Sequence, residues 1–535
     1  MKKLTFISIL LILLGCSPKI SEHFEQNRYV RNFSIHIIND SLQLYFKTPA
    51  DITYTTNKKE LKKIIRNEKF KLLDSVLVYG KTDEPPYEYF VTVSKRSNQI
   101  YPKELIVFDT VINNQTIRFI GNSLAKNSKR TLETDLNNIF KSLELGSTYR
   151  KQISTVFDIV KKHQPSNKFY AALNEISEFP TYDKQEEWSK LQMELTFSSF
   201  LGKNEFYESY LNKLESRFEP NDTISKIIRE NSVFNSQAID TIIKEAEKHK
   251  IVMINENHFY PNHRLLVFDL LQSLKEVGYK YLALEALNTK QDSILNLANS
   301  YPTLETGFYT SEQNYSNLIR KAKELGLEFI AYENTDENKN REIGQAENLY
   351  NKTFKINPNS KVIVLAGIDH ILEKPTSRGK EWMDTVFKNN YNIDPLTISQ
   401  THLNSYRKHI KSKYGIINSN LFDNERLNSI DYLLLNNATE IQMENMTASY
   451  QYKNSTENDV QIVLFFGNEI ANQYDYIKKV PYFTTIIKSG KKTELPIDVK
   501  QEIYLYTFDK NGKRIEKQII MPANNGDGCT TNQRL

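Results

Sequence analysis

The chain has 535 residues, of which 39% are hydrophobic and 25% are charged. This length predicts roughly three domains, and the composition is that of a globular protein rather than a disordered chain. The 70 basic and 65 acidic side chains leave a formal net charge of only +5, which gives no electrostatic reason to expect nucleic-acid binding. The sequence contains no zinc-finger spacing, no P-loop and no Gly-rich dinucleotide turn.

The first residues, MKKLTFISILLILLGCSPK, are typical of a secretory signal. Two lysines precede an apolar run from Leu4 to Leu14, which is too short to remain as a membrane-spanning helix. The run ends in LLGC, which resembles a bacterial lipobox, a signal whose cysteine becomes the first mature residue and carries lipid. We therefore expect residues 1–15 to be a lipoprotein signal peptide, with lipidated Cys16 holding the protein on a membrane of a bacterial cell envelope, the outer membrane. The alternative is an ordinary signal with a chance cysteine.

The next two segments differ in their hydrophobic pattern. Residues 24–125 contain β-branched and aromatic runs separated by turn residues, together with one helical run from Lys59, which is typical of a small α+β module. Residues 130–235 instead space their apolar residues three and four apart, which predicts a helical region. The helical runs are LETDLNNIFKSLEL, YRKQISTVFDIVKK and EEWSKLQMELTFSSFL.

Residues 237–403 alternate between strand and helix. The expected strands are IVMI (251–254), YLAL (281–284), EFIAY (328–332), KVIVLA (361–366) and LTIS (396–399). The expected helices cover about 261–277, 311–325, 337–354 and 379–389. Near-continuous apolar strands that alternate with helices indicate an α/β domain with a parallel sheet and helices on both faces.

Strands return towards the end of the chain. Residues 404–438 are predicted to form a helical connector, and residues 439–524 contain strand-like runs that suit a β-sandwich-like, β-rich domain. The predicted architecture is therefore a central α/β domain flanked by an α+β module, a helical region and a C-terminal β domain.

Polar side chains follow four consecutive strands of the predicted sheet. Glu256 and His258 follow the first strand, Glu285 the second, Glu333 the third and His370 the fourth. Because ligands bind outside the carboxyl ends of parallel strands, these side chains predict a functional site at one edge of the sheet. The alternative is chance, since strands often end where polar residues begin.

These residue types suit two kinds of chemistry. A carboxylate beside a neutral imidazole forms a general base with an orienting partner. The same residue types bind Zn²⁺, Mn²⁺ or Fe²⁺, and the candidate metal ligands here are Glu256, His258 and His370. The spacing of these residues in the sequence does not distinguish a general base from a metal site. Because H-E-x-x-H and G-x-S-x-G are both absent, the predicted chemistry uses water rather than an acyl-serine.

Two further residues are candidates for ligand binding. Arg341, near the start of the helix after the third strand, is suited to hold a carboxylate or an oxyanion; the alternative is a surface arginine paired with Glu337 or Glu342. His263 lies in a predicted first helical turn, where it faces either the site or solvent.

Four motifs in this region resemble a known superfamily. INENHFYPNHRLLVFDLLQSL is similar to the opening motif of the superfamily that joins ChaN-type haem-binding lipoproteins, Tiki-type metalloproteases and erythromycin esterases. YLALEAL, NREIGQAENLY and VIVLAGIDHI follow in the family's order, all within residues 237–403. The resemblance covers this domain alone.

The resemblance implies a parallel α/β core whose catalytic pocket uses five residues: Glu256, His258, Glu285, Arg341 and His370. Erythromycin esterases activate water on a lactone with a Glu/His site, and Tiki-type members hydrolyse peptides with a divalent metal. ChaN-type members are lipoproteins that bind haem, and the spacing E-x-H-x-x-P-x-H looks closest to theirs.

One position departs from the family pattern. Asn255 stands where the family has Gly, a residue that permits unusual backbone angles and close approach of a ligand. The leading expectation is a hydrolase of a small-molecule or peptide ester or amide. The alternatives are a haem- or metal-binding lipoprotein of iron uptake, in which haem needs an apolar slot and an axial Tyr or His, and a catalytically silent scaffold that binds protein partners. The oligomeric state stays open.

Overall fold

The computed structural model describes two kinds of segment. Backbone and side chains are described for residues 155–179, 181, 184–216, 218–375, 379–439, 446, 448–470 and 475–521. Strand backbones alone are described for 33–37, 44–49, 52–55, 78–81, 88–95, 103–112, 115–124, 144–145 and 533–534. The predicted signal peptide, Cys16 and the helix predicted from Lys59 lie outside these residues. None of the helices in the described part of the chain has the length and apolar character that a membrane span requires.

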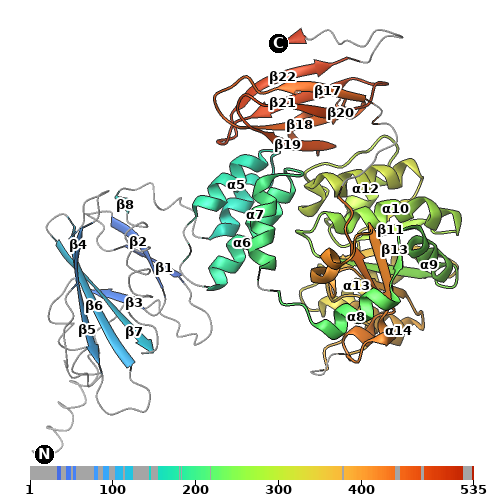
Figure 1. Cartoon of the computed structure of the whole chain (residues 1–535), viewed down its shortest axis with the longest axis horizontal. Helices are drawn as coiled ribbons and strands as arrows, with labels where there is room; N and C mark the ends of the chain where they lie inside the picture. Colours follow the sequence, from blue (N-terminus) through green and yellow to red (C-terminus); the bar gives the residue numbers. More distant parts are fainter. Residues whose placement is uncertain are drawn as a thin grey trace, which may run out of the picture. The chain divides into compact units, whose positions relative to one another are not determined.

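The chain forms two compact units, residues 1–156 with 179–190 and residues 157–178 with 191–535. The first unit contains two antiparallel sheets (Figure 1). One has the order β1-β2-β8, with β1 Phe33–Ile37, β2 Leu44–Pro49 and β8 Glu144–Leu145. The other has the order β3-β7-β6-β5-β4, with β3 Ile52–Thr55, β4 Val78–Lys81, β5 Glu88–Lys95, β6 Lys103–Ile112 and β7 Gln115–Leu124. The helix predicted for LETDLNNIFKSLEL is wrong at its end, because its last two residues, Glu144 and Leu145, form β8 and pair with β2.

Helices dominate the segment that follows. They are α4 (Val156–His163), α5 (Phe169–Glu178), α6 (Lys184–Ser199), α7 (Glu205–Glu215) and α8 (Asp222–Asn231). Asn204 and Asn221 begin α7 and α8, because each side chain accepts hydrogen bonds from backbone N–H groups of the first turn.

The second unit contains a large mixed sheet of eight strands in the order β12-β11-β13-β10-β14-β16-β15-β9. Its strands are β9 Val233–Phe234, β10 Ile251–Glu256, β11 Tyr281–Leu284, β12 Glu328–Ile330, β13 Val362–Gly367, β14 Leu396–Ser399, β15 Tyr414–Asn418 and β16 Tyr432–Asn436. Six neighbours, from β12 to β16, run parallel. β15 is antiparallel to both of its neighbours, β16 and β9. The five predicted strands all form.

Helices cover both faces of this sheet (Figure 1). Val252 and Ile254 of β10 pack with α9 (Ser236–Ala246), α10 (Asn262–Glu276) and α12 (Gln313–Glu324). Ile251 and Met253 point the other way and pack with α8, α13 (Arg341–Lys352) and α14 (Met383–Tyr391). Side chains alternate along a strand, and every residue of β10 is buried. The apolar run IVMI is explained by this double burial.

The prediction of a helical connector at 404–438 is wrong. This segment contributes β15 and β16, which extend the sheet, and its helical content is limited to the 3-10 turns Asn404–His409, Ser419–Leu421 and Leu427–Ser429. The runs YGIIN and YLLLN are short and buried, and periodicity does not separate such strands from buried helix.

Antiparallel sheets form the C-terminal region (Figure 1). Two strands, β17 (Ala448–Lys453) and β20 (Lys492–Ile497), pair with each other. Five more form the order β19-β18-β21-β22-β23, with β18 Val460–Phe466, β19 Phe483–Ile487, β21 Ile503–Phe508, β22 Arg514–Ile520 and β23 Gln533–Arg534. Side chains of both sheets share one buried apolar cluster. Of the strands in this region, β20 and β23 were missed by the prediction.

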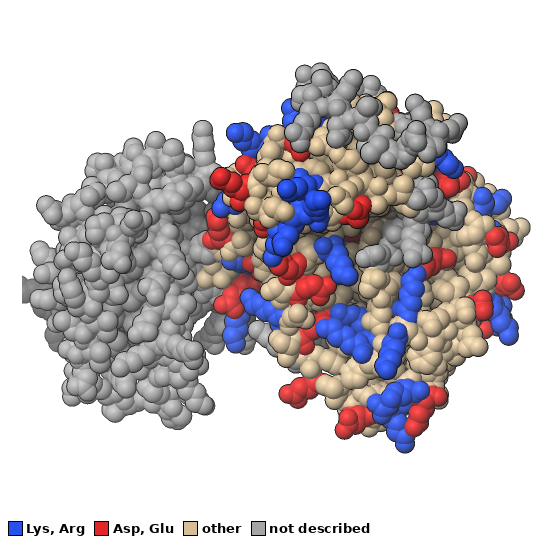
Figure 2. All heavy atoms as spheres, turned by 45° about the horizontal axis from the view of Figure 1, so that its top comes forward, with Lys and Arg blue, Asp and Glu red and all other residues tan. Residues whose placement is uncertain are grey.

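The surface carries both signs of charge. Figure 2 shows basic and acidic side chains interspersed over the described part of one face, as the small net charge of +5 predicts.

Candidate active site

The loop after β10 places a buried carboxylate beside a partly exposed imidazole. Glu256 is the last residue of β10 and is 2% exposed. Nδ1 of His258 lies 2.9 Å from Oε1 of Glu256, and Nε of Arg264 donates to Oε2 at 2.8 Å. Burial raises the pKa of Glu256, but the charge of Arg264 and the hydrogen bond from His258 outweigh it and lower the pKa overall. An ionised carboxylate only accepts hydrogen bonds, so Nδ1 donates, and Nε2 is the ring nitrogen left to take a proton.

Arg264 holds this pair from inside the core. Its side chain is fully buried, and it donates from Nη2 to the carbonyl of His258 at 2.6 Å and from Nη1 to Glu312 at 3.2 Å. Glu312 also begins α12, because its carboxylate accepts from the N–H groups of Asn314 and Tyr315. Burial raises the pKa of Glu312 to about 7 despite Arg264. One guanidinium therefore fixes the carboxylate, the backbone of His258 and a helix start.

An aromatic ring fixes the orientation of the imidazole. Tyr309, in the 3-10 turn Tyr309–Ser311, stacks on His258 with ring centroids 4.0 Å apart and an angle of 18° between the planes. This stacking restricts the side-chain rotation of His258 and gives the site an apolar wall.

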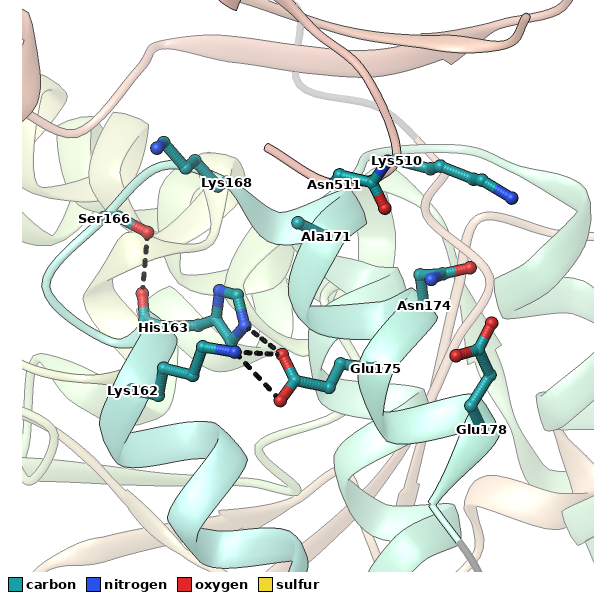
Figure 3. A pocket seen from close by; sticks show the side chains of 10 residues that line it. All are labelled: Lys162, His163, Ser166, Lys168, Ala171, Asn174, Glu175, Glu178, Lys510 and Asn511. Carbon is teal, nitrogen blue, oxygen red and sulfur yellow. Dashed lines mark hydrogen bonds and ion pairs between the residues drawn. The ribbon is translucent and has the colours of Figure 1, made fainter. Parts of the chain in front are cut away.

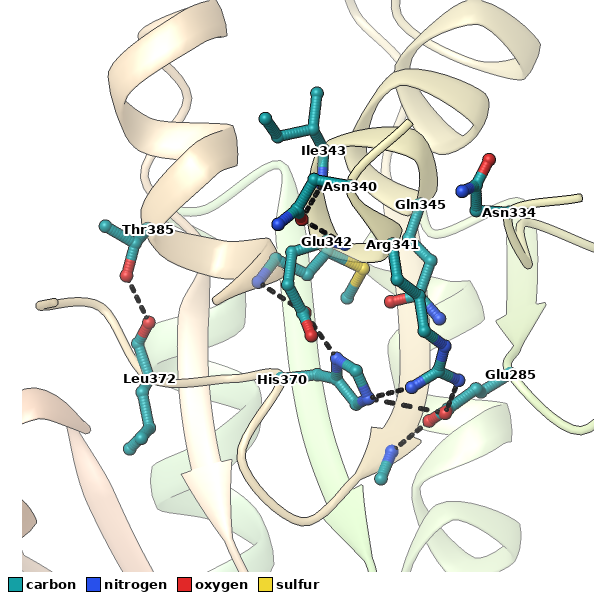
Figure 4. A network of polar contacts seen from close by, with 12 residues as sticks. Glu285, Asn334, Asn340, Arg341, Glu342, Ile343, Gln345, His370, Leu372 and Thr385 are labelled. Carbon is teal, nitrogen blue, oxygen red and sulfur yellow. Dashed lines mark hydrogen bonds and ion pairs between the residues drawn. The ribbon is translucent and has the colours of Figure 1, made fainter. Parts of the chain in front are cut away.

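Arg341 forms the second half of the cluster (Figure 4). It is the first residue of α13, and it donates from Nε to Glu333 at 2.9 Å and from Nη2 to Glu285 at 2.6 Å. Nη2 also donates to the second oxygen of Glu333. Hydrogen bonding to Glu333 and the charge of Glu285 raise the pKa of Arg341. The carboxylates from the ends of β11 and β12 are thereby bridged by one cation.

His370 lies between two carboxylates and is held as a cation (Figure 4). Nδ1 is 2.6 Å from Oε2 of Glu342, and Nε2 is 3.4 Å from Oε1 of Glu285. Burial lowers the pKa of His370, but the hydrogen bonds to Glu285 and Glu342 raise it overall to about 9. Nη1 of Arg341 lies 3.1 Å from Nε2, a hydrogen bond to the neutral ring and a contact between two cations when the ring is doubly protonated. Both are neutralised by the surrounding carboxylates.

The end of β13 lets Glu285 approach the backbone. The N–H of Gly367 donates to Oε2 of Glu285, and a Cβ at this position would lie 2.9 Å from that oxygen and 3.4 Å from the ring of His370. A side chain here would therefore push the Glu285 carboxylate away from the backbone N–H. Burial raises the pKa of Glu285, but His370, His258 and Arg341 hold it far below its ordinary value.

The structure brings six of the predicted residues together at the carboxyl edge of the parallel strands: Glu256, His258, Glu285, Glu333, Arg341 and His370. His263 differs. Its side chain lies in the core with no exposed surface, where Nδ1 accepts from the N–H of Asn257 and the ring stacks on Tyr260. Burial lowers the pKa of His263 to about 3, so it is neutral. Its position fits support of the Glu256–His258 turn.

Four residues of the cluster were not assigned roles from sequence: Arg264, Glu312, Glu342 and Gly367. Arg264 and Glu342 each follow a predicted residue directly, and their charge is the only signal in the sequence. Gly367 lies at a strand end between predicted residues. Glu312 carries no signal, because a helix-starting Glu is common.

The predicted metal ligands do not fit a divalent cation. Among the described residues, no three His, Cys, Asp or Glu side chains lie where they could hold a metal ion. The carboxylate of Glu256 is already bonded to Arg264, and that of Glu285 to Arg341. A metal would have to displace a guanidinium from each carboxylate. For an iron in haem, His258 offers the more open ring, since it is 29% exposed and His370 only 7%.

No family model and no curated protein matches the chain. Solved structures do match, at low similarity. The type III effector HopBA1 matches with 15% identity and a TM-score of 0.26, over 38% of this chain and 95% of that one. A bacterial protein toxin matches with 12% identity and a TM-score of 0.25, over 51% and 63%. RRSP, a MARTX toxin effector domain from Vibrio vulnificus CMCP6, matches with 15% identity and a TM-score of 0.21, over 46% and 56%. Scores this low do not establish a shared fold.

A polar pocket of about 520 Å³ lies elsewhere, between α5 and the turn that joins β21 to β22 (Figure 3). Lys162 and His163 both contact Glu175, at 2.7 and 2.8 Å. Burial raises the pKa of Glu175, but these partners lower it overall. Lys168 and Asn511 lie at the rim. The pocket contains no aromatic or other large apolar side chain, so it differs in character from the cluster around His258.

Proposed function

We propose that the protein hydrolyses an ester or amide by activating water with the Glu256–His258 pair. The observation that carries the proposal is the 2.9 Å contact between Nδ1 of His258 and the buried, ionised Glu256. It fixes the tautomer in which Nε2 accepts a proton, and this is the arrangement a general base needs. Arg264 and Tyr309 hold the ring in place.

In the proposed reaction, Nε2 of His258 removes a proton from water while the water oxygen attacks the carbonyl carbon. The negative charge that develops on the carbonyl oxygen is stabilised by Arg341, which is 49% exposed, and by the imidazolium of His370. His258 then returns the proton to the leaving oxygen or nitrogen. The products are a carboxylic acid and an alcohol or amine, and His258 ends neutral.

The finer architecture belongs to the same proposal. The mixed sheet and its helices form an α/β domain at about 237–403 that resembles the ChaN, Tiki and erythromycin esterase superfamily. β15 and β16 extend its sheet, and the C-terminal sheets form a β-sandwich-like domain. Residues 1–15 are proposed as a signal peptide and Cys16 as the lipid anchor to a bacterial cell envelope. The order of the four sequence motifs within residues 237–403 supports the proposed superfamily of the α/β domain.

A second candidate is a catalytically silent scaffold. One arrangement favours it: Nε and Nη2 of Arg341 are already bonded to Glu333 and Glu285, which leaves Nη1, beside His370, as the donor for an oxyanion. A measurement of substrate hydrolysis distinguishes the two candidates, because only the hydrolase converts substrate to product.

The test is hydrolysis of a panel of lactones, aryl esters and short peptides by the chain from residue 17. Glu256→Gln and His258→Ala are compared with His409→Ala, which changes an exposed histidine outside the cluster. We expect a loss of at least about 100-fold in kcat for both site variants, the range of general-base catalysis, and no change for the control. Turnover that survives both substitutions in folded protein would overturn the proposal.

A further inference from the structure

Helix α12 connects the C-terminal strands to the residues that hold the Glu256–His258 pair. At its beginning, Glu312 bonds Arg264, and the turn just before it carries Tyr309, which stacks on His258. The rest of the helix, roughly 18 Å long at 1.5 Å per residue, packs against both the α/β sheet and the C-terminal strands. One rigid element therefore contacts the imidazole at one end and a different sheet along its side.

Arg320 forms a buried joint with the C-terminal strands. Its guanidinium donates to both carboxylate oxygens of Glu469, at 2.7 and 2.8 Å, and to the carbonyl of Val480 at 2.7 Å. Arg320 and Glu469 are both buried. A buried, two-point ion pair holds its partners in a single geometry, because separation leaves an uncompensated charge.

Three more side chains of α12 bond the backbone of the same C-terminal segment, and they lie on one helix face with Arg320. They are Gln313, which accepts from Thr484 N–H at 2.9 Å, Ser316, which donates to the Pro481 carbonyl at 3.3 Å, and Asn317, which donates to the Tyr482 carbonyl at 2.8 Å. The segment before Tyr309 also contacts the C-terminal region, because Leu304 N–H donates to the Lys478 carbonyl at 2.8 Å. The contacts thus run along α12 from Gln313 to Arg320 and continue into the chain that precedes the helix.

We propose that the C-terminal strands are a positioning module for the Glu256–His258 pair, with α12 as the connection and Arg320 and Glu312 as positioning residues. The catalytic relevance of this inference rests on the proposed function, whereas the positioning itself concerns only the geometry of His258. Loosening the joint frees the start of α12, so that Tyr309 no longer restrains the imidazole. Loss of the Glu312 side chain also frees the start of α12 and Tyr309, because Glu312 bonds Arg264 and begins the helix.

The test measures the accessibility of His258 directly and needs no substrate. Diethyl pyrocarbonate acylates neutral imidazole, and peptide mass spectrometry gives the rate at His258 relative to that at the exposed His409 of the same chain. Arg320→Ala is paired with Arg514→Ala, which removes an arginine from the outer side of the same strands, where it contacts Tyr476. Glu312→Ala is paired with Asn221→Ala, which removes the side chain that begins α8.

We expect Arg320→Ala and Glu312→Ala each to accelerate His258 acylation at least threefold relative to His409, with both controls at the wild-type ratio. A wild-type ratio in either variant, with its thermal unfolding transition retained, overturns the inference. If Arg320→Ala does not fold, Glu312→Ala decides alone. Turnover can be absent while His258 responds as expected, so failure of the proposed function and failure of this inference are distinguishable.

Discussion

Nδ1 of His370 bonds the carboxylate of Glu342 at 2.6 Å, as Nδ1 of His258 bonds Glu256 at 2.9 Å. The two pairs differ at the second nitrogen. His370 faces Glu285, which holds a proton on Nε2, whereas His258 has Tyr309 stacked on its ring and keeps Nε2 for a substrate proton. The same side chain is thus arranged as a cation in one place and as a base in the other, and such a division is typical of acid–base sites.

The raised pKa of His370 predicts a pH-dependent stability. The pKa is about 9 in the folded chain and 6.5 for an ordinary histidine, so the folded state binds the proton more tightly. The contribution is fully present below pH 6.5 and is lost as the pH rises through 9; 2.5 pKa units correspond to on the order of 3 kcal/mol. The free energy of unfolding of wild type minus that of His370→Gln should fall by this amount between pH 6 and pH 9.5.

The measurement uses urea unfolding followed by tryptophan fluorescence. The chain has two tryptophans, and in a Trp188→Phe background the signal comes from Trp382, whose ring lies 5.8 Å from that of His370. A difference between the two proteins that stays constant with pH would mean that His370 is not a cation in the folded state.

Glu342→Gln should lower the pKa of His370. Glutamine keeps the shape and can accept the Nδ1 proton but removes one of the two negative charges that favour the imidazolium. An NMR titration of ¹³C-labelled histidine measures the midpoint, and we expect a fall of at least about one unit, as for the loss of a close opposite charge. The matched control is Glu347→Gln, on the same helix but paired with exposed Lys339. A midpoint that stays near 9 in Glu342→Gln would contradict the assignment.

Arg264→Ala should destabilise the chain far more than an exposed arginine substitution. Removing the buried guanidinium leaves Glu256 and Glu312 without their shared cation, and breaking a buried ion pair costs about 3–5 kcal/mol. Arg229→Ala, at an exposed position of α8, should change the free energy of unfolding by less than about 0.5 kcal/mol. Similar urea midpoints for the two variants would show that Arg264 is not structurally central.

The edge of the sheet that carries the site was predictable, because a run of four to six apolar residues marks each strand and polar residues follow its end. Glu285 and Glu333 come directly after their predicted strands, and Glu256 and His370 follow theirs within a few residues. Partners across the site were not predictable in the same way. Glu342 meets His370 from 28 positions away and Glu312 meets Arg264 from 48 positions away, and no local pattern encodes contacts of that separation.

The errors have a similar origin. β15 and β16 are five-residue strands buried within the sheet, so their apolar residues carry no alternation that would distinguish them from helix. His263 illustrates a different limit. Its neighbours in sequence are site residues, but a single helical position decides whether a side chain faces the site or the core.

The pairing of Glu256 with Arg264 and of Glu285 with Arg341 predicts that the protein does not bind a stoichiometric divalent metal at a site that combines either carboxylate with His258 and His370. Elemental analysis of the chain from residue 17, after dialysis against Zn²⁺, Mn²⁺ or Fe²⁺ and then metal-free buffer, should give well under one metal per chain. His258→Ala should give the same value. Near-stoichiometric metal that disappears in His258→Ala would show that a cation does displace Arg264 or Arg341.

Asn255 gives the sharpest test of the departure from the family pattern. It lies within β10 opposite Ala366, and the left-handed backbone that glycine would permit is not used there. Its amide instead ties three segments together. Nδ2 donates to the Ile368 carbonyl at 2.6 Å and to the hydroxyls of Ser399 and Thr401 at 3.0 and 2.8 Å, and Oδ1 accepts from Gln400 N–H at 2.7 Å.

Asn255→Gly, which introduces the residue of the superfamily that the sequence resembles, should therefore destabilise this chain. A buried group that loses its partner costs about 1–3 kcal/mol, and the N–H of buried Gln400 loses its partner, so we expect a loss of about 1–3 kcal/mol in urea unfolding. The control is Asn231→Gly, at the exposed end of α8, where the side chain bonds the Ile227 carbonyl. A loss no larger than that of the control would mean that the hydrogen bonds of the Asn255 amide do not stabilise the fold.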